Sequence, residues 1–217
     1  MSIDFSKVAV YLVTDPALSN GRSELEIVRR AAAGGIRLFQ YRDKHAGKKL
    51  YLEKARALAD LCGELGVDLI LNDHVDIAAC VDCAGIHLGQ EDLPTKEARL
   101  VVGPTKAIGR STHDIAQAHA AIAEGADYIN IGPVFATNTK NTPVKPVGLD
   151  MVREIAKITT IPVTTMGGIG MDNAAMVVGA GADRVAVVTA ITQAVDVERA
   201  SRALVEMVES AKAARSR

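Results

Sequence analysis

Short apolar runs alternate with longer, alanine-rich segments from one end of the chain to the other. Each apolar run is hydrophobic at nearly every position, which is typical of a parallel strand buried on both faces. The segments between the runs carry apolar residues at helical spacing. The predicted strands are residues 8–13, 37–41, 68–71, 85–88, 107–110, 128–131, 162–166 and 184–188. The predicted helices are residues 24–33, 48–65, 75–80, 95–102, 114–124, 149–158, 173–179 and 195–210.

Glycines mark the points where predicted helices return to strands, as at Gly34-Gly35, Gly66, Gly125 and Gly179-Ala180-Gly181. Glycine supplies the left-handed residue that ends a helix before the chain reverses. Eight strand–helix units in one domain of this length predict an α/β fold, a (β/α)₈ TIM barrel that spans residues 1–217 as a single domain. A doubly wound sheet is the alternative. It is disfavoured because the first strand leads into Val13-Thr14-Asp15-Pro16 and not into a glycine-rich dinucleotide fingerprint.

The composition of the chain limits which partners it can bind and in which compartment it functions. Aromatic residues make up only 3% of the chain and tryptophan is absent, so Val, Ile, Leu and Ala must fill the core. The net charge of −1 provides no basic field for nucleic acid or an anionic membrane, so cations that bind an anion must be local. No apolar stretch is long enough to span a bilayer, and we find no signal-peptide pattern. Three cysteines, an odd number, favour a reducing compartment, and we expect a cytoplasmic protein.

Cysteines and histidines offer little chemistry of their own. Cys80 and Cys83 have the spacing of a redox or metal-binding pair, but no second pair completes a zinc site. Cys80 closes an alanine-rich apolar run, so we interpret both as buried small hydrophobic residues. The five histidines show no metal-ligand spacing, and we assign them to helix, core or loop positions. No Ser-His-Asp or Cys-His arrangement stands out, so the candidate chemistry lies at the strand ends, where TIM barrels carry their active sites.

The second predicted strand ends in Gln40-Tyr41-Arg42-Asp43-Lys44. Successive strand residues face opposite sides, so Gln40, Arg42 and Lys44 are expected to project together. An amide, a guanidinium and an ammonium that converge at one strand end suit a polyanion such as a diphosphate. The alternative is a solvated Arg and Lys in a surface loop, and on these residues alone that alternative is favoured.

Acidic side chains follow the next two predicted strands, in Asn72-Asp73 and in Gln90-Glu91-Asp92. Mg²⁺ binds through one or two carboxylates together with waters and substrate phosphates, so Asp73 and Asp92 are candidate ligands of a single ion. Taken singly, Asp73 is explained equally well as a helix N-cap, and Asp92 as a turn residue before Pro94. The basic strand end beside them favours a site for a metal ion and a diphosphate.

Hydroxyl groups and a lysine follow the fifth and sixth predicted strands. Ser111 either donates a hydrogen bond to a phosphate or caps the next helix. The polar, proline-punctuated loop at residues 132–148 carries Thr137, Thr139 and Lys140, and long loops in compact domains are usually functional. The alternative for these three residues is a mobile surface loop.

Glycines and a threonine follow the last two predicted strands, as Gly167-Gly168 and Thr189. The corresponding loops of TIM barrels often bind phosphate through backbone N–H groups at a helix N-terminus. We therefore predict a second anion site there, distinct from the one at Arg42 and Lys44. The alternative is a tight turn, which a Gly-Gly pair also explains.

Taken together, these strand ends resemble the thiamine-phosphate synthase (thiamin phosphate pyrophosphorylase) family, and the likeness runs from Tyr11 to Ile191. The resemblance implies a TIM barrel that joins 4-amino-5-hydroxymethyl-2-methylpyrimidine diphosphate to 4-methyl-5-(2-phosphooxyethyl)thiazole, giving thiamine phosphate and diphosphate. Its partners would be these small molecules, with no nucleic acid or membrane, and we leave a homo-oligomer open. The motifs that carry the likeness are residues 40–44, 72–73, 85–92, 132–140 and 167–169.

The resemblance also implies roles for individual residues. The pyrimidine diphosphate would be held by Gln40, Tyr41, Arg42, Asp43, Lys44, Asn72, Ser111 and Lys140. The thiazole phosphate would be held by Thr137, Asn138, Thr139, Gly168, Val188 and Thr189. Asp73 and Asp92 would bind Mg²⁺, and Arg42, Lys44 and Lys140 would be the catalytic cations. Met166 and residues 142–146 look less typical of the family.

The implied chemistry explains why no catalytic triad stands out. A pyrimidinylmethyl diphosphate can ionise to a cation that the aminopyrimidine delocalises, and the thiazole nitrogen is then the nucleophile. Two alternatives remain: a thiazole tautomerase, which binds thiazole phosphate without forming a C–N bond, and a non-catalytic barrel that binds thiamine phosphate. A tautomerase does not need the diphosphate set, so the synthase is favoured by the joint presence of Gln40, Arg42, Lys44, Asp73, Asp92 and Lys140.

Overall fold

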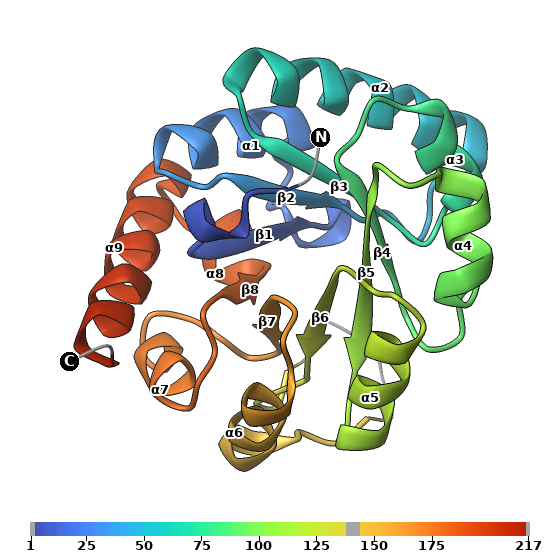
Figure 1. Cartoon of the computed structure of the whole chain (residues 1–217). Helices are drawn as coiled ribbons and strands as arrows, with labels where there is room; N and C mark the ends of the chain where they lie inside the picture. Colours follow the sequence, from blue (N-terminus) through green and yellow to red (C-terminus); the bar gives the residue numbers. More distant parts are fainter. Residues whose placement is uncertain (1–2, 138–143, 216–217) are drawn as a thin grey trace.

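A computed structural model describes residues 3–137 and 144–215 of the protein. In this part of the chain, eight parallel strands close into a barrel in sequence order (Figure 1). β8 pairs with β1 in parallel, so the sheet has no free edge, and the predicted (β/α)₈ barrel is confirmed. The strands are β1 (Val10–Thr14), β2 (Leu38–Tyr41), β3 (Asp68–Asn72), β4 (Gly85–Leu88), β5 (Ala107–Thr112), β6 (Tyr128–Ile131), β7 (Val163–Met166) and β8 (Val185–Val187).

Helices surround the barrel and cover the outer face of the strands (Figure 1). They lie close to the predicted positions, except that the last helix is longer and α8 was not predicted. A helix of one turn is too short to show a hydrophobic period. The 3-10 helices are η1 (Phe5–Lys7) and η2 (Pro16–Leu18). The α-helices are α1 (Glu24–Ala33), α2 (Lys48–Leu65), α3 (Val75–Cys80), α4 (Thr95–Val102), α5 (Ile115–Ala123), α6 (Gly148–Ile158), α7 (Ala174–Gly179), α8 (Thr189–Thr192) and α9 (Val197–Arg215).

The helices form where capping residues and apolar spacing agree, as α1 illustrates. Ser23 caps its N-terminus by accepting a hydrogen bond from the Glu26 N–H at 3.2 Å. Ile27, Val28 and Ala31 follow at helical spacing, and all three are buried against the strands. The sequence therefore sets the start of the helix and its buried face together, and this is why its bounds were predictable.

The barrel interior is filled at its N-terminal end and polar at its C-terminal end. Tyr11, Leu38, Ile70 and Tyr128 pack together inside the strands, and each is fully buried. The N-terminal segment closes this end, because the Phe5 ring lies against that of Tyr128 with centroids 5.2 Å apart. Within the described part of the chain, the barrel interior therefore leaves room for a small molecule at the opposite rim, where the strands end.

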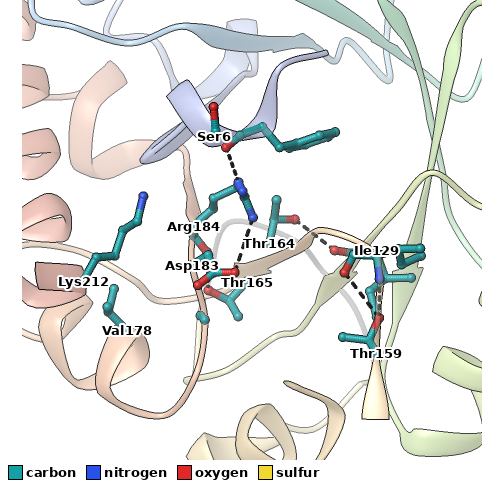
Figure 2. Close-up of polar contacts among 12 residues, drawn as sticks. Ser6, Ile129, Thr159, Thr164, Thr165, Val178, Asp183, Arg184 and Lys212 are labelled. Atoms are coloured by element: carbon teal, nitrogen blue, oxygen red, sulfur yellow. Dashed lines mark hydrogen bonds and ion pairs between the residues drawn. The ribbon is translucent and has the colours of Figure 1, made fainter. Parts of the chain in front are cut away.

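Arg184, just before β8, holds the N-terminal segment in place. Its side chain extends towards η1 (Figure 2), and its Nε donates to the Phe5 carbonyl at 2.9 Å. The Arg184 carbonyl in turn accepts a hydrogen bond from Thr165 Oγ1 on β7 at 3.1 Å. Burial lowers the pKa of this guanidinium from its ordinary value, although Asp183 opposes the shift. The floor of the barrel is thus tied to the two strands that complete it.

The structure bears on two features considered from the sequence: membrane-spanning helices and the burial of the cysteines. Among the described residues, no helix combines the length and hydropathy that a membrane span requires. Cys83 is buried, as interpreted from the sequence, and burial raises the pKa of its thiol. The interpretation is wrong for Cys80, which is exposed because it closes the short helix α3 on the side away from the barrel's core.

Gly109 on β5 is required by the close approach of Tyr128. A Cβ atom at position 109 would lie 2.0 Å from Cζ of the Tyr128 ring, well inside van der Waals contact. The ring cannot retreat, because it is fully buried and also packs against Phe5 and Tyr11. The small residue on one strand and the large residue on its neighbour are therefore a matched pair.

We predict that Gly109→Ala lowers the free energy of unfolding by about 3 kcal/mol, because the added methyl group overpacks the barrel interior. The matched control is Gly63→Ala in α2, where the new Cβ would meet nothing within 4 Å. The control should raise the free energy of unfolding by up to about 1 kcal/mol, because glycine is a poor helix former. Urea denaturation of the two variants checks this, and a similar stability for both would contradict the packing argument.

Candidate active site

A cavity of about 860 Å³ opens at the C-terminal rim of the barrel, within the range of small-molecule sites. Strand ends and the loops that follow them form its walls. Most of the site residues expected from the sequence line it, although they come from seven different strand ends. These lining residues are Gln40, Arg42, Lys44, Asn72, Asp73, Asp92, Ser111, Thr137, Gly168, Val188 and Thr189.

Other expected site residues lie elsewhere. Tyr41 is fully buried on the outer face of the barrel, and its ring centroid lies 4.4 Å from that of Tyr51 on α2. Asp43 is also buried behind the strand end, where Oδ1 accepts hydrogen bonds from the N–H groups of His45 and Ala46, each at 3.0 Å. Neither residue lines the cavity, because strand alternation turns them away from it. Asn138, Thr139 and Lys140 lie outside the described residues.

Arg42 enters the cavity already paired with a carboxylate. One terminal nitrogen, Nη1, forms a short ion pair with Oδ2 of Asp15, which follows β1. The side chains are only 13% and 11% exposed, and Asp15 is fixed further because Oδ1 accepts from the Ala17 N–H at 3.1 Å. Arg42 Nε is buried without a hydrogen-bond partner in the described chain. The ion pair fixes the guanidinium while leaving other N–H donors available for an anion.

Lys44 and Asp73 form a second ion pair across the ends of β2 and β3. Asp73 has a left-handed backbone (φ 62°), which is uncommon for a residue other than glycine. Its own N–H donates to the His87 carbonyl at 3.0 Å, so the strand end is anchored to β4 in this conformation. Of the three cations expected to bind the diphosphate, the two that the structure describes, Arg42 and Lys44, thus each carry a carboxylate partner.

Asp92 lies beside Asp73 and is half-buried. Burial raises the pKa of the Asp92 carboxyl above its ordinary value, and the neighbouring Asp73 carboxylate raises it further. The Gly89 N–H opposes the shift by donating to Asp92 Oδ2 at 2.6 Å. Two adjacent carboxylates that disfavour each other's charge are a fitting place for a cation. In the described part of the chain, no group of three or more His, Cys, Asp or Glu is arranged to hold a metal.

A chain of hydrogen bonds crosses the barrel below the cavity. Gln40 Nε2 donates to Tyr11 Oη at 2.6 Å, and Tyr11 Oη lies 3.0 Å from Tyr128 Oη. Tyr128 Oη is 3.0 Å from His87 Nδ1, and His87 Nε2 is 3.0 Å from Ser111 Oγ. The two end residues of this chain, Gln40 and Ser111, both line the cavity.

The loops after β6 and β7 are packed together on the far side of the cavity. The Phe135 N–H donates to the Gly167 carbonyl at 3.0 Å. A Cβ atom on Gly168 would lie 2.6 Å from the Ala136 carbonyl oxygen, and its φ of 64° also favours glycine. This pair of loops therefore needs glycine for its own packing as well as for any approach of a phosphate group.

Several polar residues of the cavity were not assigned to it from the sequence, and Asp15, His87 and Asn130 are three of them. Each faces inwards from a strand or from the residue after it, and Asn130 Oδ1 accepts from Thr164 Oγ1 at 2.7 Å. The available signal was a polar residue in an otherwise apolar run, two positions from another inward-facing residue. His87 is buried, as expected for a core histidine, but its ring also reaches the cavity.

Comparisons with known proteins identify the family of the chain. The family model described as thiamine monophosphate synthase matches residues 10–191. A thiamine-phosphate synthase of Chloroflexus aurantiacus is 45% identical, over 92% of this chain and 92% of the relative. One of Shouchella clausii is 44% identical, over 93% of this chain and 97% of the relative.

A solved structure from the same family has a fold similar to that of this chain. Thiamine phosphate pyrophosphorylase from Pyrococcus furiosus superimposes with a TM-score of 0.87 at 36% sequence identity, covering 94% of this chain and 97% of that one. A structure titled "Native KDPGal structure", at 14% identity and a TM-score of 0.73, shows only the shared fold. From its barrel, its cavity and these relatives, the chain belongs to the thiamine monophosphate synthase family, whose members are transferases of thiamine biosynthesis.

Proposed function

We propose that the cavity binds the two substrates side by side, with their phosphate groups on opposite walls. The pyrimidine diphosphate takes the wall formed by the ends of β2 to β5, and the thiazole phosphate takes the loops after β6 to β8. The observation that carries this proposal is the separation of chemistry around the rim. Arg42, Lys44, Asp73 and Asp92 gather on one wall, while glycines and the Thr189 hydroxyl line the other.

We infer that Mg²⁺ joins the donor substrate at Asp73 and Asp92. Two carboxylates match the small number of protein ligands that this ion uses beside substrate phosphates and water. The fit is supported by the Lys44 ammonium, a cation that already pairs with Asp73, and by the raised pKa of Asp92. When bound, Mg²⁺ supplies positive charge to the diphosphate oxygens. With the ion held by Asp73 and Asp92, the Lys44 ammonium would be free to contact the diphosphate.

The residues of the chain bind and orient the substrates and stabilise the charge that develops on the diphosphate. As the C–O bond of the pyrimidinylmethyl group breaks, its electron pair leaves on the diphosphate, where Arg42 and Lys44 balance the growing charge. The lone pair of the thiazole nitrogen then forms the C–N bond, giving the thiazolium of thiamine phosphate. No proton is transferred in either step, so no general base or protein nucleophile is needed. The enclosed cavity serves to keep water from the cation.

Lys140, Asn138 and Thr139 enter this proposal through the family resemblance alone. Lys140 would be a third cation for the diphosphate, and the other two residues would contact the thiazole phosphate. The net charge of −1 and the odd number of cysteines support a cytoplasmic protein whose ligands are small molecules. Its oligomeric state is left open.

We predict that incubating the protein with both substrates and Mg²⁺ releases one diphosphate for each thiamine phosphate formed. Omitting the thiazole phosphate should suppress thiamine phosphate formation completely. Diphosphate can be measured by a coupled phosphate assay and thiamine phosphate by oxidation to a fluorescent thiochrome. Binding of both substrates without diphosphate release would instead identify a binding or tautomerase-like barrel.

We predict that Asp92→Asn raises the Mg²⁺ concentration needed for half-maximal activity and lowers turnover at least tenfold, because one of two carboxylate ligands becomes neutral. The matched control is Asp76→Asn on α3. Asp76 is exposed, pairs with Lys48 at 2.6 Å and does not line the cavity. The control should keep the wild-type Mg²⁺ dependence. Full activity of folded Asp92→Asn at low Mg²⁺ would remove the metal assignment.

We predict that Thr189→Val raises the KM for thiazole phosphate by about tenfold, the effect of losing one hydrogen bond to a charged group, and changes the KM for the pyrimidine diphosphate little. The reason is that Thr189 lines the wall assigned to the acceptor. Thr189→Ser keeps the hydroxyl and should stay close to wild type. Equal changes in both KM values for Thr189→Val would show that the division of the cavity is wrong.

A further inference from the structure

The hydrogen-bond chain below the cavity connects the two sides of the wall assigned to the donor substrate, because Gln40 lies on β2 and Ser111 lies on β5. It runs from Gln40 through Tyr11, Tyr128 and His87 to Ser111, with donor–acceptor distances between 2.6 and 3.0 Å. Both tyrosines are fully buried and neither lines the cavity. The two tyrosines are therefore beyond the reach of any substrate, while Gln40, His87 and Ser111 face the cavity. Either tyrosine can influence the reaction only through its neighbours.

The chain has a defined direction. An amide nitrogen can only donate, so Gln40 Nε2 uses Tyr11 Oη as an acceptor, and the Tyr11 proton is left for Tyr128. Tyr128 in turn donates to His87 Nδ1, since its buried proton would otherwise lack an acceptor. An imidazole that accepts at Nδ1 is neutral and carries its single proton on Nε2. That proton is donated to Ser111 Oγ.

The direction determines what Ser111 offers to the cavity. Its oxygen already accepts from His87, and within the described chain no other hydrogen bond of this hydroxyl is found. The hydroxyl proton is therefore directed to a ligand in the cavity and suits an anionic oxygen, such as that of a diphosphate. With the opposite direction, Ser111 would donate to His87 and present only lone pairs, which repel an anion.

We propose that Tyr128 is a positioning residue for the transfer reaction: through His87 it fixes the Ser111 hydroxyl as a hydrogen-bond donor to the diphosphate substrate. The proposal rests on the assignment of Ser111 to the donor wall in the proposed function. Burial raises the pKa of both Tyr11 and Tyr128 well above the ordinary value, so both hydroxyls keep their protons. Gly109 makes room for the Tyr128 ring and so keeps its hydroxyl in line.

The tautomer of His87 tests the direction without any substrate. Long-range ¹H–¹⁵N correlation spectra distinguish a protonated Nε2 from a protonated Nδ1, and the His87 signals are assigned by their loss in His87→Gln. The wild type should show the proton on Nε2. In Tyr128→Phe, which removes only the hydroxyl, Nδ1 loses its donor and both tautomers should be seen. A wild-type proton on Nδ1, or an unchanged tautomer in Tyr128→Phe, overturns the proposal.

A double-mutant cycle tests the effect on the reaction. Tyr128→Phe should lower kcat/KM for the pyrimidine diphosphate by about tenfold, and Ser111→Ala by at least as much. In the Ser111→Ala background, Tyr128→Phe should cost less than about twofold, because there is no hydroxyl left to position. If Tyr128→Phe costs the same tenfold in both backgrounds, the tyrosine acts through packing and the positioning role is excluded.

Control variants separate the possible failures. Thr165→Val removes another buried hydroxyl, which lies on β7 and donates to the Arg184 carbonyl, and this variant should keep wild-type kinetics.

If Tyr128→Phe does not fold, His87→Gln and His87→Leu replace it. The glutamine keeps an N–H donor for Ser111 and should retain several times the kcat/KM of the leucine variant, and equal values overturn the proposal. If Ser111→Ala behaves as wild type, the assignment of Ser111 to the donor wall fails, and the positioning role fails with it.

Discussion

The closure of the barrel by β8 on β1 is the constraint on which the rest of the structure depends. Closure leaves no strand edge for backbone groups and turns alternate side chains of every strand into a narrow interior. Aromatic rings and the N-terminal segment fill the lower part of that interior. Among the residues that the structure describes, the interior leaves its space at the C-terminal rim, so residues separated by more than a hundred positions in the sequence meet around one cavity.

The cations that the structure describes on the donor side of this rim, Arg42 and Lys44, are paired with carboxylates before any ligand arrives. Arg42 pairs with Asp15, and Lys44 pairs with Asp73, while Asp92 stands beside Asp73. Buried charges are costly unless they are paired, so Asp15 offsets the cost of burying the Arg42 guanidinium. A bound diphosphate and a metal ion would replace one set of partners with another. On the proposed function, binding would thus exchange ion pairs and would not create unpaired charge.

Below the charged rim, the barrel carries a polar layer in place of a purely apolar core. Its hydroxyls and imidazole satisfy one another, as buried polar groups must, and they connect Gln40 to Ser111. The packing of Tyr128 over Gly109 keeps this layer in register. The same few side chains therefore pack the barrel interior and contact two residues that line the cavity, Gln40 and Ser111.

The sequence by itself determined the order of strands and helices, the barrel, and the common direction of Gln40, Arg42 and Lys44, because each depends on local periodicity and strand alternation. The same alternation turns Tyr41 and Asp43 away from the cavity, although the family resemblance included them. Only the tertiary structure decided that Asp15 meets Arg42, that Lys44 meets Asp73, and that His87 connects Tyr128 to Ser111. These partners are brought together by barrel closure, and no local pattern in the chain encodes which distant side chains will then lie within hydrogen-bonding distance.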